Sequence, residues 1–179
     1  MRTAITSAAV LIVAAVAFGQ GSSSLPYTIT VSGRILGELD GDPIKGALVI
    51  VRCNNLSEEI LMPNGRGKYT TDLRRGQRYE FTYTAPGMVA KRVLIDTHGA
   101  PPLLDVPAIN MTVDITLFPP VQGVDPKLFL EPMGKASYKH SVRNIVWDKA
   151  YGEEMRAKTR RYMAGYDKKV NGDFVTDQH

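Results

Sequence analysis

Residues 27–118 alternate apolar and polar side chains in short runs, and this pattern limits the fold more than any other feature of the chain. Apolar side chains at every second position are typical of strands that bury one face. Each run ends near Gly, Pro, Asn or Asp, and none continues with the 3.6-residue period of a helix. The pattern predicts about seven strands, at residues 27–36, 46–53, 58–62, 67–73, 78–84, 89–96 and 110–117.

Short strands in sequence, without helices between them, predict an all-β fold: a Greek-key β-sandwich of two sheets over residues 27–118. The missing helices exclude a parallel α/β sheet. The second run is apolar on both faces, with Val49 and Val51 on one and Leu48 and Ile50 on the other, as expected of a strand inside a sheet. Cys53 is the single cysteine of the chain, so it forms no internal disulfide, and we expect it to be a small buried side chain.

Several of these runs share their residue order with a known domain family. The matching motifs are Val-Ser-Gly at 31–33, Pro-Ile-Lys-Gly-Ala-Leu-Val-Ile-Val at 43–51, Gly-Lys-Tyr at 67–69 and Leu-Arg-Arg-Gly-Gln-Arg-Tyr at 73–79. In these motifs the chain resembles the carboxypeptidase-regulatory-like domain, a transthyretin-like (prealbumin-like) β-sandwich. The resemblance spans residues 31–117. It implies a sandwich that packs beside a catalytic or transport domain, or an exported adhesion or assembly module, and it implies no catalytic residue.

The first 19 residues have the features of a cleavable export signal. Arg2 gives a positive start, residues 8–18 are apolar and uncharged, and Ala17 and Gly19 provide the small residues that a signal peptidase needs. The apolar run is shorter than the roughly 20 residues of a membrane-spanning helix. We therefore expect a signal peptide at 1–19, a linker at 20–26, a periplasmic or extracellular protein of the cell envelope, and no membrane span after signal removal.

The region after the predicted sandwich has a different pattern. We expect an extended connector at 119–143, an amphipathic helix at 144–169 and a flexible end at 170–179. Five large side chains lie four, four, seven and four residues apart, which would align them on one helix face: Trp147, Tyr151, Met155, Tyr162 and Tyr166. This face either packs on the chain's own sandwich or binds a partner protein of the envelope. The tail is similar to segments of regulatory-like-domain proteins from Bacteroidota envelopes.

The charge of the chain is concentrated in this tail. The formal net charge is +4, and from residue 127 onward eleven Lys and Arg face seven Asp and Glu. An excess of this size does not predict nucleic acid as a partner. Four basic residues near two turns are the candidates for a glycan or other ligand site in the sandwich loops: Arg66, Lys68, Arg74 and Arg75.

The sequence contains no pattern typical of catalysis or metal binding. The histidines lie in separate segments, the acidic turn at 38–42 lacks the later carboxylate of an EF-hand, and no Gly-x-Ser-x-Gly elbow occurs. We therefore predict no enzyme, no metal and no cofactor. The predicted function is a structural or interaction module of the cell envelope, with the sandwich as platform and the helix as contact. The alternative is a carbohydrate- or other ligand-binding domain that uses the sandwich loops.

Overall fold

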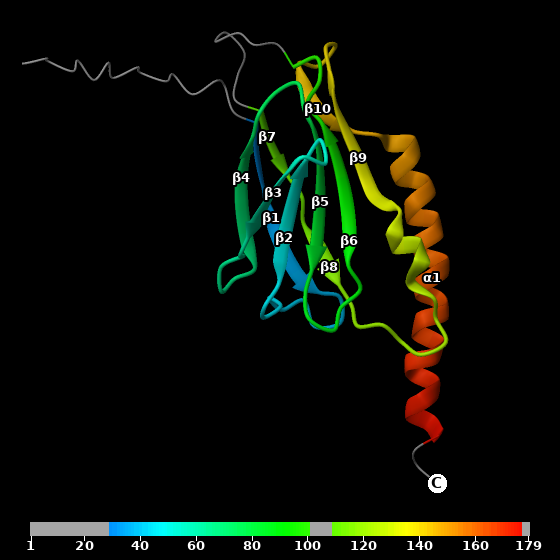
Figure 1. Ribbon diagram of the computed structural model, residues 1–179. Helices are drawn as coiled ribbons and strands as arrows, with labels where there is room; N and C mark the ends of the chain where they lie inside the picture. Colours follow the sequence, from blue (N-terminus) through cyan, green and yellow to red (C-terminus); the bar gives the residue numbers. More distant parts are fainter. Residues whose placement is uncertain (1–28, 101–108, 177–179) are drawn as a thin grey trace, which may run out of the picture.

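The computed structural model describes residues 29–100 and 109–176, which form two β-sheets with one long helix beside them (Figure 1). The predicted signal peptide and linker lie outside the described residues. The elements are β1 (Ile29–Gly37), β2 (Leu48–Cys53), β3 (Ser57–Leu61), β4 (Lys68–Leu73), β5 (Arg78–Thr84), β6 (Lys91–Asp96), β7 (Ile109–Thr112), β8 (Ile115–Leu117), the 3-10 helix η1 (Pro126–Leu130), β9 (Pro132–Lys139), β10 (Asn144–Trp147) and α1 (Lys149–Thr176). This arrangement confirms the predicted all-β sandwich with a C-terminal helix.

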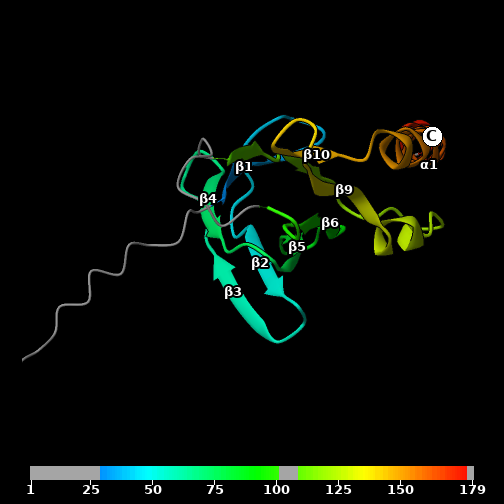
Figure 2. The same cartoon turned by 90° about the horizontal axis from the view of Figure 1, so that it is seen from above.

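The two sheets differ in width. In the smaller sheet β1 is central, antiparallel to β4 on one side and parallel to β7 and β8 on the other. The larger sheet has the order β10-β9-β6-β5-β2-β3, and within it only β6 and β9 pair in parallel. Seen from above, β10 lies close to the smaller sheet, and α1 stands outside β9 and β10 (Figure 2). β10 contacts β7 at this side of the sandwich.

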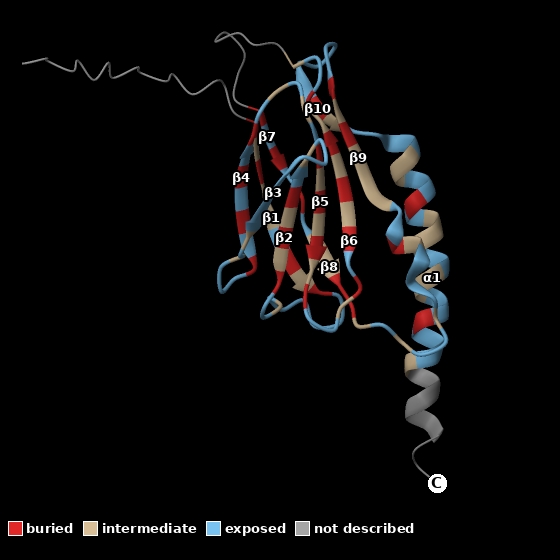
Figure 3. Cartoon of the chain, viewed as in Figure 1, coloured by how far each residue is buried: buried red, intermediate tan, exposed pale blue. Residues whose placement is uncertain are grey.

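The core lies between the sheets and follows the predicted alternation. Ile29, Val31 and Ile35 of β1 are fully buried, and so are Phe81 and Tyr83 of β5. Figure 3 shows buried and less buried residues alternating along the strands. Cys53 is an exception to the expectation, because it is only half-buried; its thiol lies 3.6 Å from the side-chain oxygen of Gln77 near the end of the sheet.

The run predicted as one strand at 110–117 is divided into β7 and β8. Between them, the Asp114 carboxylate accepts a hydrogen bond of 2.9 Å from the Arg34 backbone N–H, in the place of a ladder partner. The Val113 carbonyl accepts a bond of 2.8 Å from the Tyr69 hydroxyl. It also lies so close to β1 that a Cβ built on Gly33 would be 1.9 Å from the Val113 oxygen. The absence of a side chain at Gly33 is therefore what permits this approach.

The structure corrects three boundaries in the tail. The expected connector at 119–143 contains η1 and β9, and β9 belongs to the larger sheet because it pairs with β6. The expected helix start at 144 is strand β10, and α1 begins at Lys149 because Asp148 caps it: its carboxylate accepts a bond of 3.0 Å from the Tyr151 N–H. The segment at 170–176, expected to be flexible, continues α1.

Replacing Gly33 by Ala is expected to destabilise the protein by about 1–3 kcal/mol, because the new methyl group forces β1 away from Val113. Denaturant unfolding of Gly33→Ala measures this loss. Gly65→Ala is the matched control, since a Cβ at Gly65 meets no atom within 4 Å. Equal unfolding midpoints for the two variants would contradict the role given to Gly33.

The buried tyrosines predict that the folded state loses stability at alkaline pH. Burial raises the pKa of Tyr69 and of Tyr79 to about 12 from an ordinary value near 10, and it raises the pKa of Tyr83 as well. A raised folded-state pKa gives stability that is complete below the unfolded value and is lost as the pH rises toward the folded one. The melting temperature should therefore fall between about pH 10 and about pH 12.

Thermal melting across this range, with absorbance titration of the phenols, measures the effect. Tyr83→Phe removes one of the three groups and should make the decline with pH shallower. An unchanged slope in this variant would show that other groups cause the alkaline loss.

Candidate functional site

The position of α1 is fixed by contacts with β9 and the residues before it. The Tyr151 hydroxyl donates a hydrogen bond of 2.6 Å to the Pro132 carbonyl, and the Lys135 ammonium lies 3.9 Å from the centre of the Tyr151 ring. One to two turns later Met155 is fully buried, and Lys158 pairs with Glu131 at 3.4 Å. The first half of the helix is thus attached along β9.

A cluster of four aromatic rings holds the second half of the helix. This aromatic cluster consists of Phe118, Phe129, Tyr162 and Tyr166, which come from the end of β8, from η1 and from α1. Phe118 meets Phe129 and Tyr166 edge-on, with ring centres 5.1 and 5.2 Å apart, and Phe129 meets Tyr162 edge-on at 4.9 Å. Edge-to-face contacts at these distances add to the free energy of burial.

The Lys91 side chain lies under this cluster and is buried. Its ammonium is 3.9 Å from the Glu38 carboxylate and 5.0 Å from the centre of the Phe118 ring. Burial lowers the pKa of Lys91, and the Glu38 charge opposes that shift. Since this shift makes the folded state more stable as the pH rises toward 10.5, it opposes rather than causes alkaline unfolding.

The five side chains predicted to form one helix face are divided by the structure. Tyr151, Met155, Tyr162 and Tyr166 are on α1 and face the chain's own sandwich, where Met155 and Tyr166 are each only 1% exposed. This is the intramolecular alternative of the two that the sequence left open. Trp147 does not belong to the helix: it lies on β10 and is 40% exposed. Its spacing of four from Tyr151 matches the helix period by coincidence.

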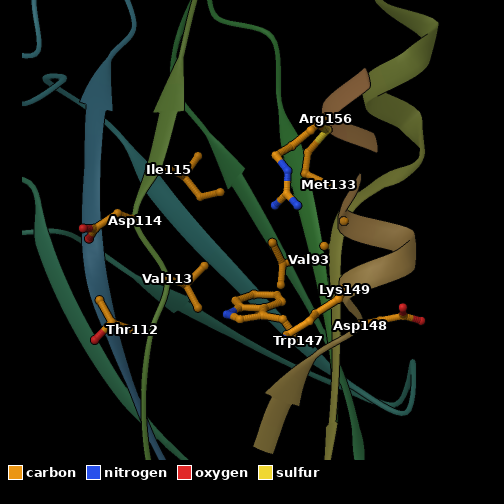
Figure 4. A pocket seen from close by; sticks show the side chains of 12 residues that line it. Val93, Thr112, Val113, Asp114, Ile115, Met133, Trp147, Asp148, Lys149 and Arg156 are labelled. Atoms are coloured by element: carbon orange, nitrogen blue, oxygen red, sulfur yellow. The ribbon is translucent and has the colours of Figure 1, made fainter. Parts of the chain in front are cut away.

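A cavity of about 380 Å³ lies between the first turns of α1, the strands β9 and β10, and the segment that joins β7 to β8. Its apolar lining consists of Val93, Val113, Ile115, Met133 and the Trp147 ring. Figure 4 shows Val113 and Ile115 on one side and the helix on the other, with the indole between them. We call this cavity the Trp147 pocket.

Two glycines shape the walls of the Trp147 pocket. A Cβ built on Gly134 would be 2.8 Å from the Trp147 ring, so the indole lies directly against the backbone of β9. Gly152, on the first turn of α1, lines the pocket without a side chain, and a Cβ there would be 3.7 Å from Nη1 of Arg156. Gly134 thus makes room for the indole, and Gly152 leaves open space on the helix side of the pocket.

Of the charged side chains that line the pocket, Arg156 is the one whose charge extends into the cavity. Asp114 pairs with Arg34 at 3.4 Å, and Asp148 caps α1, and both carboxylates point away from the cavity (Figure 4). The Arg156 guanidinium extends into it, above Trp147 and Val93. Among the residues that the structure describes, neither Arg156 nor Lys149 has a carboxylate within ion-pair distance. The pocket thus offers one guanidinium, without an ion pair among the described residues, beside an apolar surface.

The four basic residues predicted as ligand loops are not brought together. Arg66 and Lys68 are at the start of β4, whereas Arg74 and Arg75 follow its end, so a whole strand separates the two pairs. The nearby Tyr69, Tyr79 and Tyr83 are buried in the core and present no ring to a ligand. In the described part of the sandwich, these three rings therefore do not form the exposed aromatic surface that carbohydrate sites commonly use.

Of the residues that line the pocket, the sequence pattern had indicated Trp147 as a candidate, but not Arg156, Lys149 or the aliphatic side chains. They come from β6, the β7–β8 segment, β9 and α1, and only the fold places them together. One local signal was present: Asp148, between Trp147 and Lys149, is a typical N-cap residue, and it marks the start of the helix after Trp147.

Comparisons with known proteins do not place the chain in a family. No protein-family model matches it, and no curated protein matches it. Parts of the chain are similar to the TIE protein of Bacillus anthracis, at 16% identity over 52% of this chain and 17% of that chain, with a TM-score of 0.36. Catechol 1,2-dioxygenase from Acinetobacter is 15% identical over 59% of this chain and 57% of that one, with a TM-score of 0.39. The pilus 2b backbone protein of group B streptococcus is 10% identical over 52% of this chain and 42% of that one, with a TM-score of 0.35.

These likenesses are too distant to support a conclusion about function. This chain spans less than a fifth of the length of the TIE protein.

None of the helices in residues 29–100 and 109–176 has both the length and the apolar character that a membrane-spanning helix requires.

Tyr166→Ala is expected to lower the free energy of unfolding by about 3 kcal/mol, because it removes a fully buried ring from the aromatic cluster. Arg160→Ala, at an exposed position of the same helix, should change it by less than about 0.5 kcal/mol. Denaturant unfolding of both variants measures the difference. If Tyr166→Ala unfolds like the control, α1 is not part of the folded core.

Proposed function

We propose that this chain is a non-catalytic ligand-binding module of the cell envelope, and that the Trp147 pocket is its binding site. The observation that carries the proposal is the pocket itself, where an exposed indole, apolar side chains and an unpaired arginine converge. Its volume of about 380 Å³ is within the range of small-molecule sites, which are mostly apolar with a few placed polar groups.

The chemistry of the lining favours binding over turnover. The residues that line the pocket include no Ser, Cys or His. A nucleophile or general base must reach the reacting atom, and the two carboxylates of the lining are turned away from the cavity (Figure 4). Arg156 and Trp147 can hold a ligand but are not nucleophiles, and Lys149 is an exposed residue at the start of α1.

The rest of the fold suits a rigid support for such a site. Sandwich strands and an attached helix supply the walls, so the site needs no ordering of loops before a ligand enters. We also propose that the sandwich is a carboxypeptidase-regulatory-like domain, on the motifs at 31–33, 43–51, 67–69 and 73–79, and that it is exported, on the features of residues 1–19. The buried aromatic face of α1 leaves the outer surface of the helix for any contact with an envelope protein.

Filling the pocket tests the proposal. Gly152→Leu should place a side chain in the cavity without unfolding the protein, since Gly152 has space beside it and Leu favours a helix more than Gly does. Gly165→Leu is the matched control, on the same helix, where a Cβ meets no atom within 4 Å. Trp147 is the single tryptophan of the chain, so its fluorescence reports on this pocket directly.

The probes are phenylacetate, phenylethanol, phenylethylamine and methyl glucoside, each titrated to millimolar concentration. At least one should change the Trp147 emission saturably in the wild type and in Gly165→Leu, and this response should be lost in Gly152→Leu. The proposal fails if no probe gives a saturable response in the wild type, or if Gly152→Leu responds as the control does.

A further inference from the structure

We infer that the ligand of the Trp147 pocket is a compact organic carboxylate with an apolar, ring-sized body. This inference rests on the proposed function and specifies the class of ligand. Three features of the pocket determine it: the composition of the walls, the charge that extends into the cavity, and the volume.

The walls favour an apolar body over a hydroxylated one. Ile115 and Met133 are partly exposed and line the cavity with the indole, whereas Val93 and Val113 are only 2% and 3% exposed and add little accessible surface. The one neutral polar side chain of the lining is Thr112, and it points away from the cavity (Figure 4). Sugar hydroxyl groups beyond the reach of Arg156 and the indole N–H would lose their water here without gaining a side-chain partner, at a cost of about 1–3 kcal/mol for each such group. A flat apolar ring would instead bury its faces against the indole and the aliphatic side chains.

The charge favours an anion, and a carboxylate in particular. The Arg156 guanidinium extends into the cavity (Figure 4), while Lys149 is an exposed lining residue at the start of α1. In the described part of the chain neither cation has an ion-pair partner, while Asp114 is engaged by Arg34 and Asp148 by the helix cap. A guanidinium binds a carboxylate through two parallel N–H···O bonds, and such charge-assisted bonds are stronger than neutral ones.

The volume limits the size of the ligand. A cavity of about 150 Å³ is sufficient for benzene. The Trp147 pocket, at about 380 Å³, therefore accommodates one such ring, a short link and a carboxylate.

Three of the probes have nearly the same shape and differ in charge. Phenylacetate is an anion, phenylethanol is neutral and phenylethylamine is a cation. Titration calorimetry and Trp147 emission give a Kd for each. We expect phenylacetate to bind most tightly and phenylethylamine least. Arg156→Gln should weaken phenylacetate about tenfold, the loss of one charge-assisted hydrogen bond, and leave phenylethanol unchanged. Arg160→Gln, on the same helix but outside the pocket lining, should change neither.

The outcomes separate this inference from the proposed function. If phenylethanol, phenylethylamine or methyl glucoside binds in the pocket as tightly as phenylacetate, the carboxylate inference is overturned and the binding module remains. The same holds if phenylacetate binds Arg156→Gln as tightly as the wild type. If no probe binds the wild type, both fail. Phenylacetate binding that is lost in Gly152→Leu and weakened specifically in Arg156→Gln supports both.

Discussion

The parallel pairing of β9 with β6 is the interaction on which the candidate site depends. Because β9 adds to the larger sheet in this direction, β10 returns beside it and brings Trp147 onto Gly134. Asp148 follows at once and begins α1, which then runs back along β9. Without this pairing, residues after β8 would have no fixed position relative to the sandwich. The walls of the pocket are thus a consequence of one strand addition.

This strand is also where the sequence was least informative. Strands such as β1 and β5 bury branched or aromatic side chains at alternate positions, and their pattern is readable because water and core select opposite residue types. The inward positions of β9 are Gly134, Ala136 and Tyr138, of which the first two are small, and the strand begins with Pro132. Its stability comes from hydrogen bonds to β6, which no local pattern records. The expected connector was wrong for this reason.

The tail also shows that a helical spacing of side chains can assign a residue to the wrong element. Tyr151, Met155, Tyr162 and Tyr166 do lie on one side of a helix, as their spacing predicted. The same spacing also placed Trp147 on the helix, but the N-cap at Asp148 separates Trp147 from it. Periodicity finds the helix interior, whereas the cap determines where it begins. The candidate ligand residues could not be found in this way, because they gather from four distant parts of the chain.

The aromatic face of α1 cannot pack on the sandwich and on a partner protein at the same time. Its use against Phe118 and Phe129 means that a partner could reach it only after the helix had separated from the sandwich, at the cost of the burial of Met155 and Tyr166. The other end of the helix differs. There Gly134 lets the indole lie against β9, Gly152 leaves the helix wall without a side chain, and the indole stays 40% exposed. A helix that is closely packed at one end and leaves a cavity at the other places the available binding surface of this chain at Trp147.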